Sequence, residues 1–168
     1  KSLANIALGV SDLDALKAAD FPGNGRTVEE ELAQKIATIG ENMTLRRAAK
    51  LSVANGVLAS YVHSAVAPGR GKIGVLVSLE SDADTDKLAE LGKQLAMHIA
   101  AAKPLAVSQD DLGQAEVERE KAVLSEQARE SGKPEEIIEK MIAGRVAKFL
   151  KESSLVDQPF VKDPDTTV

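Results

Sequence analysis

The spacing of apolar residues changes along this chain from a helical period to a strand period and back, which limits the folds available to it. Three segments alternate apolar and polar side chains with the period of a half-buried strand: residues 43–51, 57–63 and 73–79. Helical spacing occurs on either side, in residues 12–19, 27–38 and 84–102. Thr27 and Glu30 have the spacing of a capping box at the start of the second of these helices. The mixture predicts a protein of the α+β class.

The three alternating segments follow one another closely, and the loop SAVAPGRGK between the last two contains the proline and glycines that turns use. Consecutive strands joined by short loops predict an antiparallel three-stranded meander. The helix over residues 84–102 is ended by Pro104, and we expect it to pack across the sheet. Its apolar face consists of Leu88, Leu91, Leu95 and Ile99.

Two charge-rich helical stretches, residues 116–131 and 134–151, are joined only by SGKP, which predicts an antiparallel helical hairpin, a coiled-coil-like insertion. The second arm carries a full apolar stripe: Ile137, Ile138, Met141, Ile142, Val146, Phe149 and Leu150. The first arm offers only Val117, Val123, Leu124 and a few alanines. The stripe is wider than the first arm covers, so the remainder must be buried against the body or another chain.

These patterns divide the chain into three predicted parts. Residues 1–107 form an α+β core subdomain, and residues 108–153 form a hairpin element of the dimerisation type. Residues 154–168 return the chain to a second core subdomain that we expect to be truncated, because the sequence begins at Lys1 and stops at Val168. The strands of such a fragment are left with an open edge.

Composition excludes several classes of function. There is no cysteine, so disulfides, a thiolate nucleophile and a cysteine-ligated metal are excluded. The net charge of −5 and the aromatic content of 2% disfavour a direct nucleic-acid surface. No apolar run is long enough for a membrane span, and the first residues carry no cleavage-site pattern, which favours an intracellular location.

Motifs that suggest catalysis fail when their context is considered. PGRGK at residues 68–72 lacks the earlier glycine of a phosphate-binding loop, and Ile73 stands where that loop has serine or threonine. His63 and His98 have no acidic partner at metal-ligand spacing, and they are interpreted as a strand-end histidine and a helix-face histidine. We therefore predict no catalytic residue, no cofactor and no metal, and a protein that is not an enzyme.

The segment LVDQPFVKDP, residues 155–164, follows the hairpin and contains two prolines that forbid helix. Two readings stay open for its aromatic residue. Phe160 and Val161 are both rigid apolar anchors on an extended backbone, or Phe160 is tucked under the core and only Val161 faces outward.

Several blocks occur in an order that resembles elongation factor Ts, and the resemblance covers the chain from about Ile36 onward. The blocks are IGENMTLRR (39–47), YVHS (61–64), GKIGVLV (71–77), AMHIAAAKP (96–104), SGKPEEIIEKMIAGR (131–145) and QPFVKDP (158–164). The resemblance implies a guanine-nucleotide exchange factor that binds elongation factor Tu and promotes GDP release, in the bacterial cytoplasm or an organellar matrix or stroma. It also implies two sheet-containing subdomains and a hairpin that serves dimerisation.

The family uses its core to grip the third domain of elongation factor Tu, and the resemblance carries this role to Ile39, Gly40, His63 and Val161, with Phe160 beside Val161. Gly40 also has a local reason, because a helix ending at Thr38 or Ile39 is followed by a residue that tolerates positive φ. Ile39 is expected to be partly in the core, and His63 to lie at the rim of the sheet.

The sequence departs from the family pattern in one functional element. We expect the family's amino-terminal domain and its Thr-Asp-Phe motif to be absent from this chain. The motif is not carried over to Asp20 and Phe21, because Ala19 precedes them. We expect a fragment that keeps the grip on elongation factor Tu and has little exchange activity. The alternative is a helical-hairpin oligomerisation or adaptor module without exchange activity.

Overall fold

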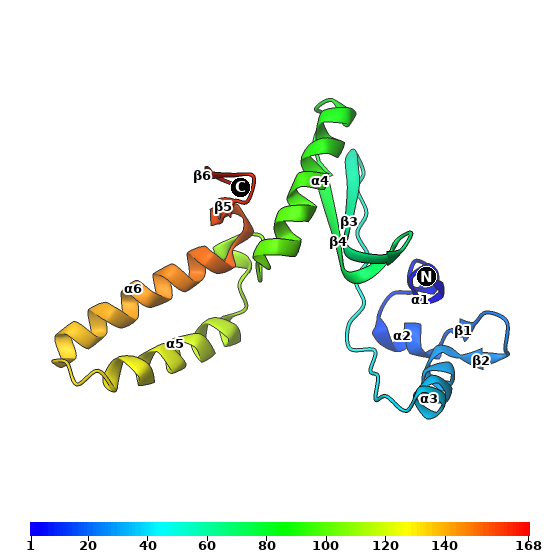
Figure 1. Ribbon diagram of the computed structural model, residues 1–168, viewed down its shortest axis with the longest axis horizontal. Helices are drawn as coiled ribbons and strands as arrows, with labels where there is room; N and C mark the ends of the chain where they lie inside the picture. The colour runs from blue at the N-terminus through cyan, green and yellow to red at the C-terminus, as the bar shows by residue number, and fades with distance from the viewer. The chain divides into compact units, whose positions relative to one another are not determined.

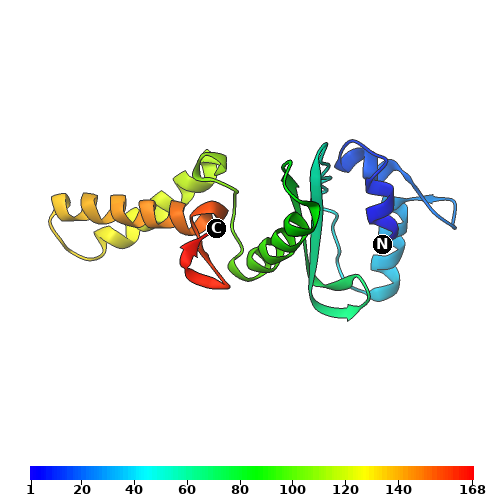
Figure 2. The ribbon, with the colours of Figure 1, turned by 90° about the horizontal axis from the view of Figure 1, so that it is seen from above.

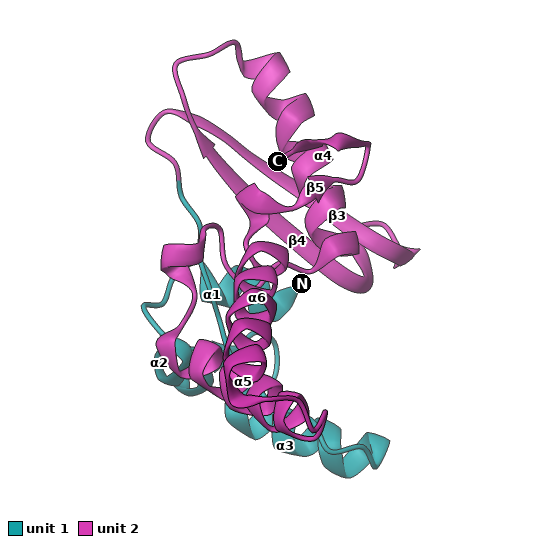
Figure 3. Cartoon of the chain, turned by 90° about the vertical axis from the view of Figure 1, so that its left-hand side faces the viewer, with its two compact units in different colours: residues 1–52 teal, residues 53–168 magenta.

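The structure is a computed structural model that describes residues 1–168, and the chain forms two compact units. The first unit is Lys1–Ser52 and the second is Val53–Val168 (Figure 3). Each unit contains both helix and strand, so the predicted mixture of the two is confirmed and is compatible with the α+β class.

The first unit is mainly helical, with one very short strand pair (Figure 1). Its elements are α1 (Ser2–Ala7), α2 (Leu13–Ala18), β1 (Asp20–Phe21), β2 (Arg26–Thr27) and α3 (Val28–Ile39). The Asp12 carboxylate caps α2 by accepting a 2.8 Å hydrogen bond from the Ala15 N–H. That hydrogen bond, together with a weaker contribution from Ser11, holds the pKa of Asp12 below its usual range.

Helix α3 begins and ends with the signals that the sequence predicted. The Thr27 side chain accepts from the Glu30 N–H, and the Glu30 carboxylate accepts from the Thr27 N–H, so the capping box is confirmed. At the other end Gly40 adopts φ +79°, and its N–H donates to the Ile36 carbonyl oxygen across 2.8 Å. Val28 and Leu16 form the small core of this unit.

The strand predicted over residues 43–51 is wrong, because the backbone there has no strand partner. Met43 and Leu45 are half-buried and lie against α3, which explains the alternation that the sequence shows. Alternating apolar and polar side chains require only that one side of the segment is buried; they do not require a hydrogen-bonded neighbouring strand. The alanines and the lysine of this segment also have a low propensity for strands. The predicted three-stranded meander is therefore a two-stranded ribbon.

That ribbon opens the second unit and consists of β3 (Gly56–Ala67) and β4 (Arg70–Glu80). The strands are antiparallel, with Val57 opposite Leu79 and His63 opposite Ile73. The turn between them is at Pro68 and Gly69, so PGRGK contributes to a β-turn. The predicted strand pair is confirmed, and it extends beyond the predicted bounds at both ends.

Helix α4 (Thr85–Ala102) packs on one face of the ribbon (Figures 1 and 2). A Cβ atom at Gly92 would lie 2.7 Å from the Cβ of Ala59, so the glycine permits a close approach of helix to strand. The core between the two layers contains Val77, Leu88 and Ala96, all buried. Leu58 and Leu76, on the face of the ribbon opposite Ala59 and Val77, are exposed.

The helical hairpin consists of α5 (Gln114–Arg129) and α6 (Glu135–Ser153), which run side by side in opposite directions (Figure 1). Ala128 and Ile138 are the buried apolar residues of its seam, near the connection between the helices. The single-turn helices η1 (Gln109–Asp111) and η2 (Leu155–Asp157) lie before and after the hairpin.

The two ends of the hairpin are joined by backbone hydrogen bonds. The Leu105 N–H donates to the Ser153 carbonyl across 2.8 Å, and the Leu155 N–H donates to the Ala106 carbonyl across 2.9 Å. Ala106 and Ser154 form a parallel bridge. The chain then closes with the short antiparallel pair β5 (Pro159–Phe160) and β6 (Asp163–Thr167).

None of the helices is both long enough and apolar enough to cross a lipid bilayer.

Candidate functional site

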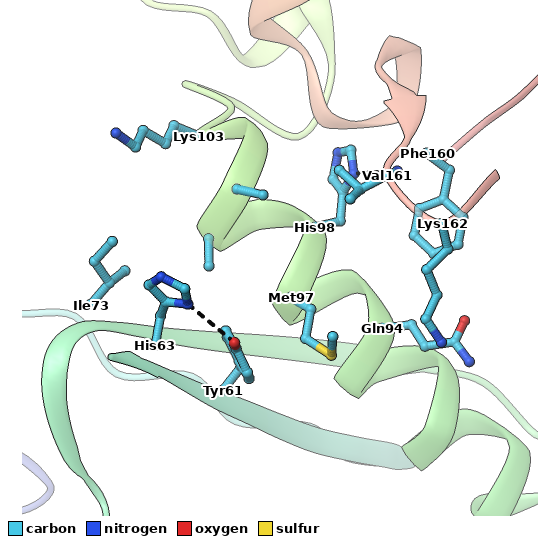
Figure 4. A pocket seen from close by; sticks show the side chains of 12 residues that line it. Tyr61, His63, Ile73, Gln94, Met97, His98, Lys103, Phe160, Val161 and Lys162 are labelled. Atoms are coloured by element: carbon cyan, nitrogen blue, oxygen red, sulfur yellow. Dashed lines mark hydrogen bonds between the residues drawn. The ribbon is translucent and has the colours of Figure 1, made fainter. Parts of the chain in front are cut away.

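A groove of about 450 Å³ runs along α4 in the second unit. Its lining comes from the ribbon, from α4 and from the segment that follows the hairpin (Figure 4). Among the lining residues are Tyr61, His63, Ile73, Met97, His98, Phe160, Val161 and Lys162. Three residues that the sequence singled out, His63, Phe160 and Val161, therefore meet in one place although two of them lie far from the third in sequence.

His63 reaches the groove from β3, on the strand face that also carries Tyr61. Its ring is exposed, as predicted for the rim of the sheet, and its Nδ1 lies 3.2 Å from the Tyr61 hydroxyl (Figure 4). The Tyr61 hydroxyl can donate to Nδ1 and leave Nε2 free. The arrangement presents a polar ring nitrogen at the edge of a largely apolar groove.

Phe160 and Val161 differ in exposure. Phe160 is half-buried beside the ring of His98, with 5.7 Å between the ring centroids and 41° between the ring planes. Val161 is 54% exposed and lies in the two-residue turn between β5 and β6. The structure thus supports the reading in which Phe160 is tucked in and Val161 faces outward.

Ile39 and Gly40 belong to the first unit and do not line this groove. Ile39 is the last residue of α3, is 56% exposed and borders a separate hollow of about 360 Å³ formed with Leu32 and Met43. Ile39 was expected to be partly in the core, and its only such contact is the one with this hollow. Gly40 is the left-handed residue that ends α3, which confirms its predicted local role.

His98 has a position that the sequence did not reveal. The sequence places it on a helix face, but it is only 1% exposed. The face of α4 that packs on the ribbon contains Leu88, Gly92 and Ala96, and His98 lies about 200° around the helix from Ala96. Helix α4 therefore has two buried faces. The predicted apolar stripe matches the ribbon face only in part, because Leu91 is 45% exposed while Gly92 approaches the ribbon, and no apolar spacing indicates the face with His98.

The electrostatic character of the groove differs from that of the whole chain. The chain carries a net charge of −5, yet the groove is lined by two lysines, Lys103 and Lys162, and by no carboxylate. Its other lining is largely apolar. An apolar strip with cationic ends suits a protein partner whose surface offers apolar side chains next to acidic ones.

Comparison with known proteins gives a consistent result. A family model described as "Elongation factor TS" matches residues 1–168. Elongation factor Ts of Bartonella henselae is 53% identical over 169 residues, which cover 100% of this chain and 55% of the relative. Elongation factor Ts of Caulobacter vibrioides is 56% identical over 169 residues, covering 100% of this chain and 54% of the relative.

Elongation factor Ts of Rhodospirillum centenum is 55% identical over 157 residues, covering 94% of this chain and 51% of the relative. The chain spans about half the length of the curated relatives it matches. The match runs through both compact units and through every residue that lines the groove. The chain belongs to the elongation factor Ts family.

Proposed function

We propose that this chain binds elongation factor Tu and serves guanine-nucleotide exchange on it, in the bacterial cytoplasm. The observation that carries the proposal is that His63, Phe160 and Val161 line one groove. These residues come from separate parts of the sequence, and the family resemblance implies a partner-binding role for His63 and Val161, with Phe160 beside Val161. Ile39 and Gly40, at the end of α3, provide a second contact to the same partner.

The chemistry of the groove suits a grip on the third domain of elongation factor Tu. Val161 presents an apolar side chain at the tip of a turn, and Phe160 supports it from beneath. Pro159 and Pro164 flank the turn and restrict its backbone before binding. A contact residue that is already held in place loses less conformational entropy when the complex forms.

Exchange requires more than a grip. The factor must bind the nucleotide-free partner more tightly than the nucleotide-bound partner, and by linkage it then lowers the affinity for nucleotide by the same factor. In this family the disturbance of the magnesium and phosphate site is attributed to the Thr-Asp-Phe motif. The Asp20 and Phe21 of this chain follow Ala19 and form β1. We therefore expect this chain to bind elongation factor Tu and to accelerate GDP release weakly.

Titration calorimetry with elongation factor Tu and release of a fluorescent GDP analogue, run on one preparation, test the proposal. Val161→Asp should weaken binding by roughly 10- to 150-fold, because an apolar contact worth about 1.5 to 3 kcal/mol is lost. His63→Ala should weaken it less. Val156→Asp is the matched control, because Val156 is also an exposed valine of the second unit but does not line the groove.

Two results would contradict the proposal. Absence of binding by the unaltered chain would show that these units do not carry the interface. Equal losses for Val161→Asp and Val156→Asp would show that the groove is not the contact surface. Acceleration of GDP release to the level of a full exchange factor would instead overturn the expected weakness of exchange.

A second candidate function, an oligomerisation or adaptor module, is favoured by the hairpin. A hollow of about 470 Å³ lies between α5 and α6, bordered by Val117, Ile142 and Val146. Val123 and Ile137 are exposed on the same two helices. In this proposal residues 108–153 pair with a second copy, while residues 1–107 and 154–168 form the core. Binding of elongation factor Tu distinguishes the two functions, because an oligomerisation module does not require that partner. Sedimentation at several concentrations then measures self-association through the hairpin.

A further inference from the structure

We infer that His98 is a positioning residue that holds Val161 in the orientation in which it contacts the partner. The inference rests on the proposed function of the groove. His98 itself is 1% exposed and buries its ring beneath the turn, so it acts through Val161 and does not meet the partner directly. Its two ring nitrogens bind two points of the segment that follows the hairpin.

The first point is the turn itself. The backbone N–H of Val161 donates a hydrogen bond to Nδ1 of His98 across 3.2 Å. The second point is Gln158, which is 4% exposed and whose Oε1 lies 2.9 Å from Nε2 of His98. Gln158 continues the network, because its Nε2 donates to the Glu152 carbonyl across 2.6 Å. Helix α4, the end of α6 and the turn are thus joined by one chain of hydrogen bonds.

The network permits a single protonation state of the ring. The Glu152 carbonyl only accepts, so the Gln158 amide nitrogen faces it and the Gln158 oxygen faces His98. His98 must therefore donate from Nε2. The Val161 N–H only donates, so Nδ1 must be unprotonated. Both ends require the neutral ring with its proton on Nε2, and every polar atom of the network is satisfied.

Few other hydrogen bonds act on the tip of the turn, although Pro159 and Pro164 restrict its backbone. Strands β5 and β6 pair at only two positions, Pro159 with Thr167 and Phe160 with Asp163, with a register shift between them. The Val168 N–H donates to the Gln158 carbonyl, which closes the base of the pair but does not reach its tip. The hydrogen bond from Val161 to His98 therefore ties the exposed valine itself to α4, while the ring contact holds the neighbouring Phe160.

Two substitutions of His98 distinguish the roles of its two ring nitrogens. The amide oxygen of asparagine can take the place of Nδ1 and accept from the Val161 N–H, so His98→Asn keeps the contact with the turn. The amide nitrogen of glutamine can take the place of Nε2, so His98→Gln keeps the contact with Gln158 and loses that with Val161. Both variants lose the ring that lies beside Phe160, so the difference between them isolates the Val161 hydrogen bond.

The first measurement needs no partner. Hydrogen exchange of the Val161 amide should be slow in the unaltered chain and in His98→Asn, and at least tenfold faster in His98→Gln. Nitrogen NMR of the unaltered chain should show the neutral His98 ring with its proton on Nε2. Rapid exchange of this amide in the unaltered chain, or a proton on Nδ1, would overturn the inference whether or not elongation factor Tu binds.

The second measurement is affinity for elongation factor Tu. His98→Asn should bind within about threefold of the unaltered chain, and His98→Gln at least tenfold more weakly. Combining His98→Gln with Val161→Ala should add little to Val161→Ala alone, because both changes remove the same contact. Additive losses would show that His98 supports the fold in general and not the Val161 contact.

Gln109→Ala is the matched control for lost hydrogen bonding near this segment. The Gln109 amide nitrogen donates to the Asp157 carboxylate across 2.7 Å, next to Gln158 in sequence, but Gln109 does not line the groove. Its removal should leave the Val161 amide and the affinity unchanged. If the unaltered chain does not bind elongation factor Tu, the proposed function fails while amide exchange still decides the role of His98.

Discussion

Glycine-to-alanine substitutions in two helices of this chain are expected to change stability in opposite directions. A Cβ atom at Gly92 of α4 would lie 2.7 Å from the Ala59 Cβ and 3.4 Å from Cδ1 of Leu79. Carbon atoms in contact are normally about 3.5 to 4.0 Å apart, so helix and ribbon must separate by roughly 1 Å to admit the methyl group. A Cβ atom at Gly144 of α6 meets nothing within 4 Å.

The magnitudes follow from two opposing terms. Alanine gains about 1 kcal/mol over glycine in a helix interior, and this gain applies at both sites. Overpacking of the α4 contact costs about 1 to 3 kcal/mol and applies only at Gly92. Gly144→Ala should therefore raise the free energy of unfolding by about 1 kcal/mol, whereas Gly92→Ala should lower it by up to about 2 kcal/mol.

Urea unfolding followed by far-ultraviolet circular dichroism measures both changes, since the chain has no tryptophan and one tyrosine. Adding Ala59→Gly removes the atom that the new methyl group meets, so the double variant should be more stable than the sum of the single changes indicates. Equal stabilisation by Gly92→Ala and Gly144→Ala would refute the close approach of α4 to β3.

Two further pairs of substitutions test the end of α3 and the seam of the hairpin. Gly40→Ala should lower the melting temperature by an amount equivalent to about 1 to 2 kcal/mol because φ is +79°, and Gly40→Asn should do so less, since asparagine tolerates this conformation; equal melting temperatures would show that Gly40 is not under this constraint. Ile138→Glu should destabilise the chain by more than about 1.5 kcal/mol because Ile138 is 4% exposed, while Ile137→Glu, at a residue 45% exposed, should change stability by less than about 0.5 kcal/mol. Similar losses at these adjacent positions would place the buried seam of the hairpin elsewhere.

The sequence predicted those elements whose signals are local. The capping box of Thr27 and Glu30, the glycine after α3 and the turn at Pro68 and Gly69 each depend on a few neighbouring residues, and all three are present. The long helices were predicted to within a few residues because apolar spacing persists over many turns.

The features that the sequence did not predict depend on how separate elements pack against one another. The alternation at Met43 and Leu45 arises because these two side chains are half-buried against α3, although the segment has no strand partner. The burial of His98 could not be predicted from apolar spacing, because His98 is polar and its ring nitrogens are hydrogen-bonded by Gln158 and Val161. His63 and Val161 line the same groove because of where the turn between β5 and β6 lies against α4, and no spacing in the sequence encodes that position.

The bridge between Ala106 and Ser154 makes the helical hairpin an insertion whose two ends lie together, because the chain leaves and rejoins the rest of the unit at one point. For a segment whose ends are fixed together, closure entropy grows only with the logarithm of its length, by about 0.6 kcal/mol for each doubling. The length of α5 and α6 is therefore almost unconstrained by the need to bring Gln158 beneath His98. A shorter hairpin, a longer hairpin or a foreign segment inserted between Val107 and Ser154 therefore has nearly the same entropic cost of closure.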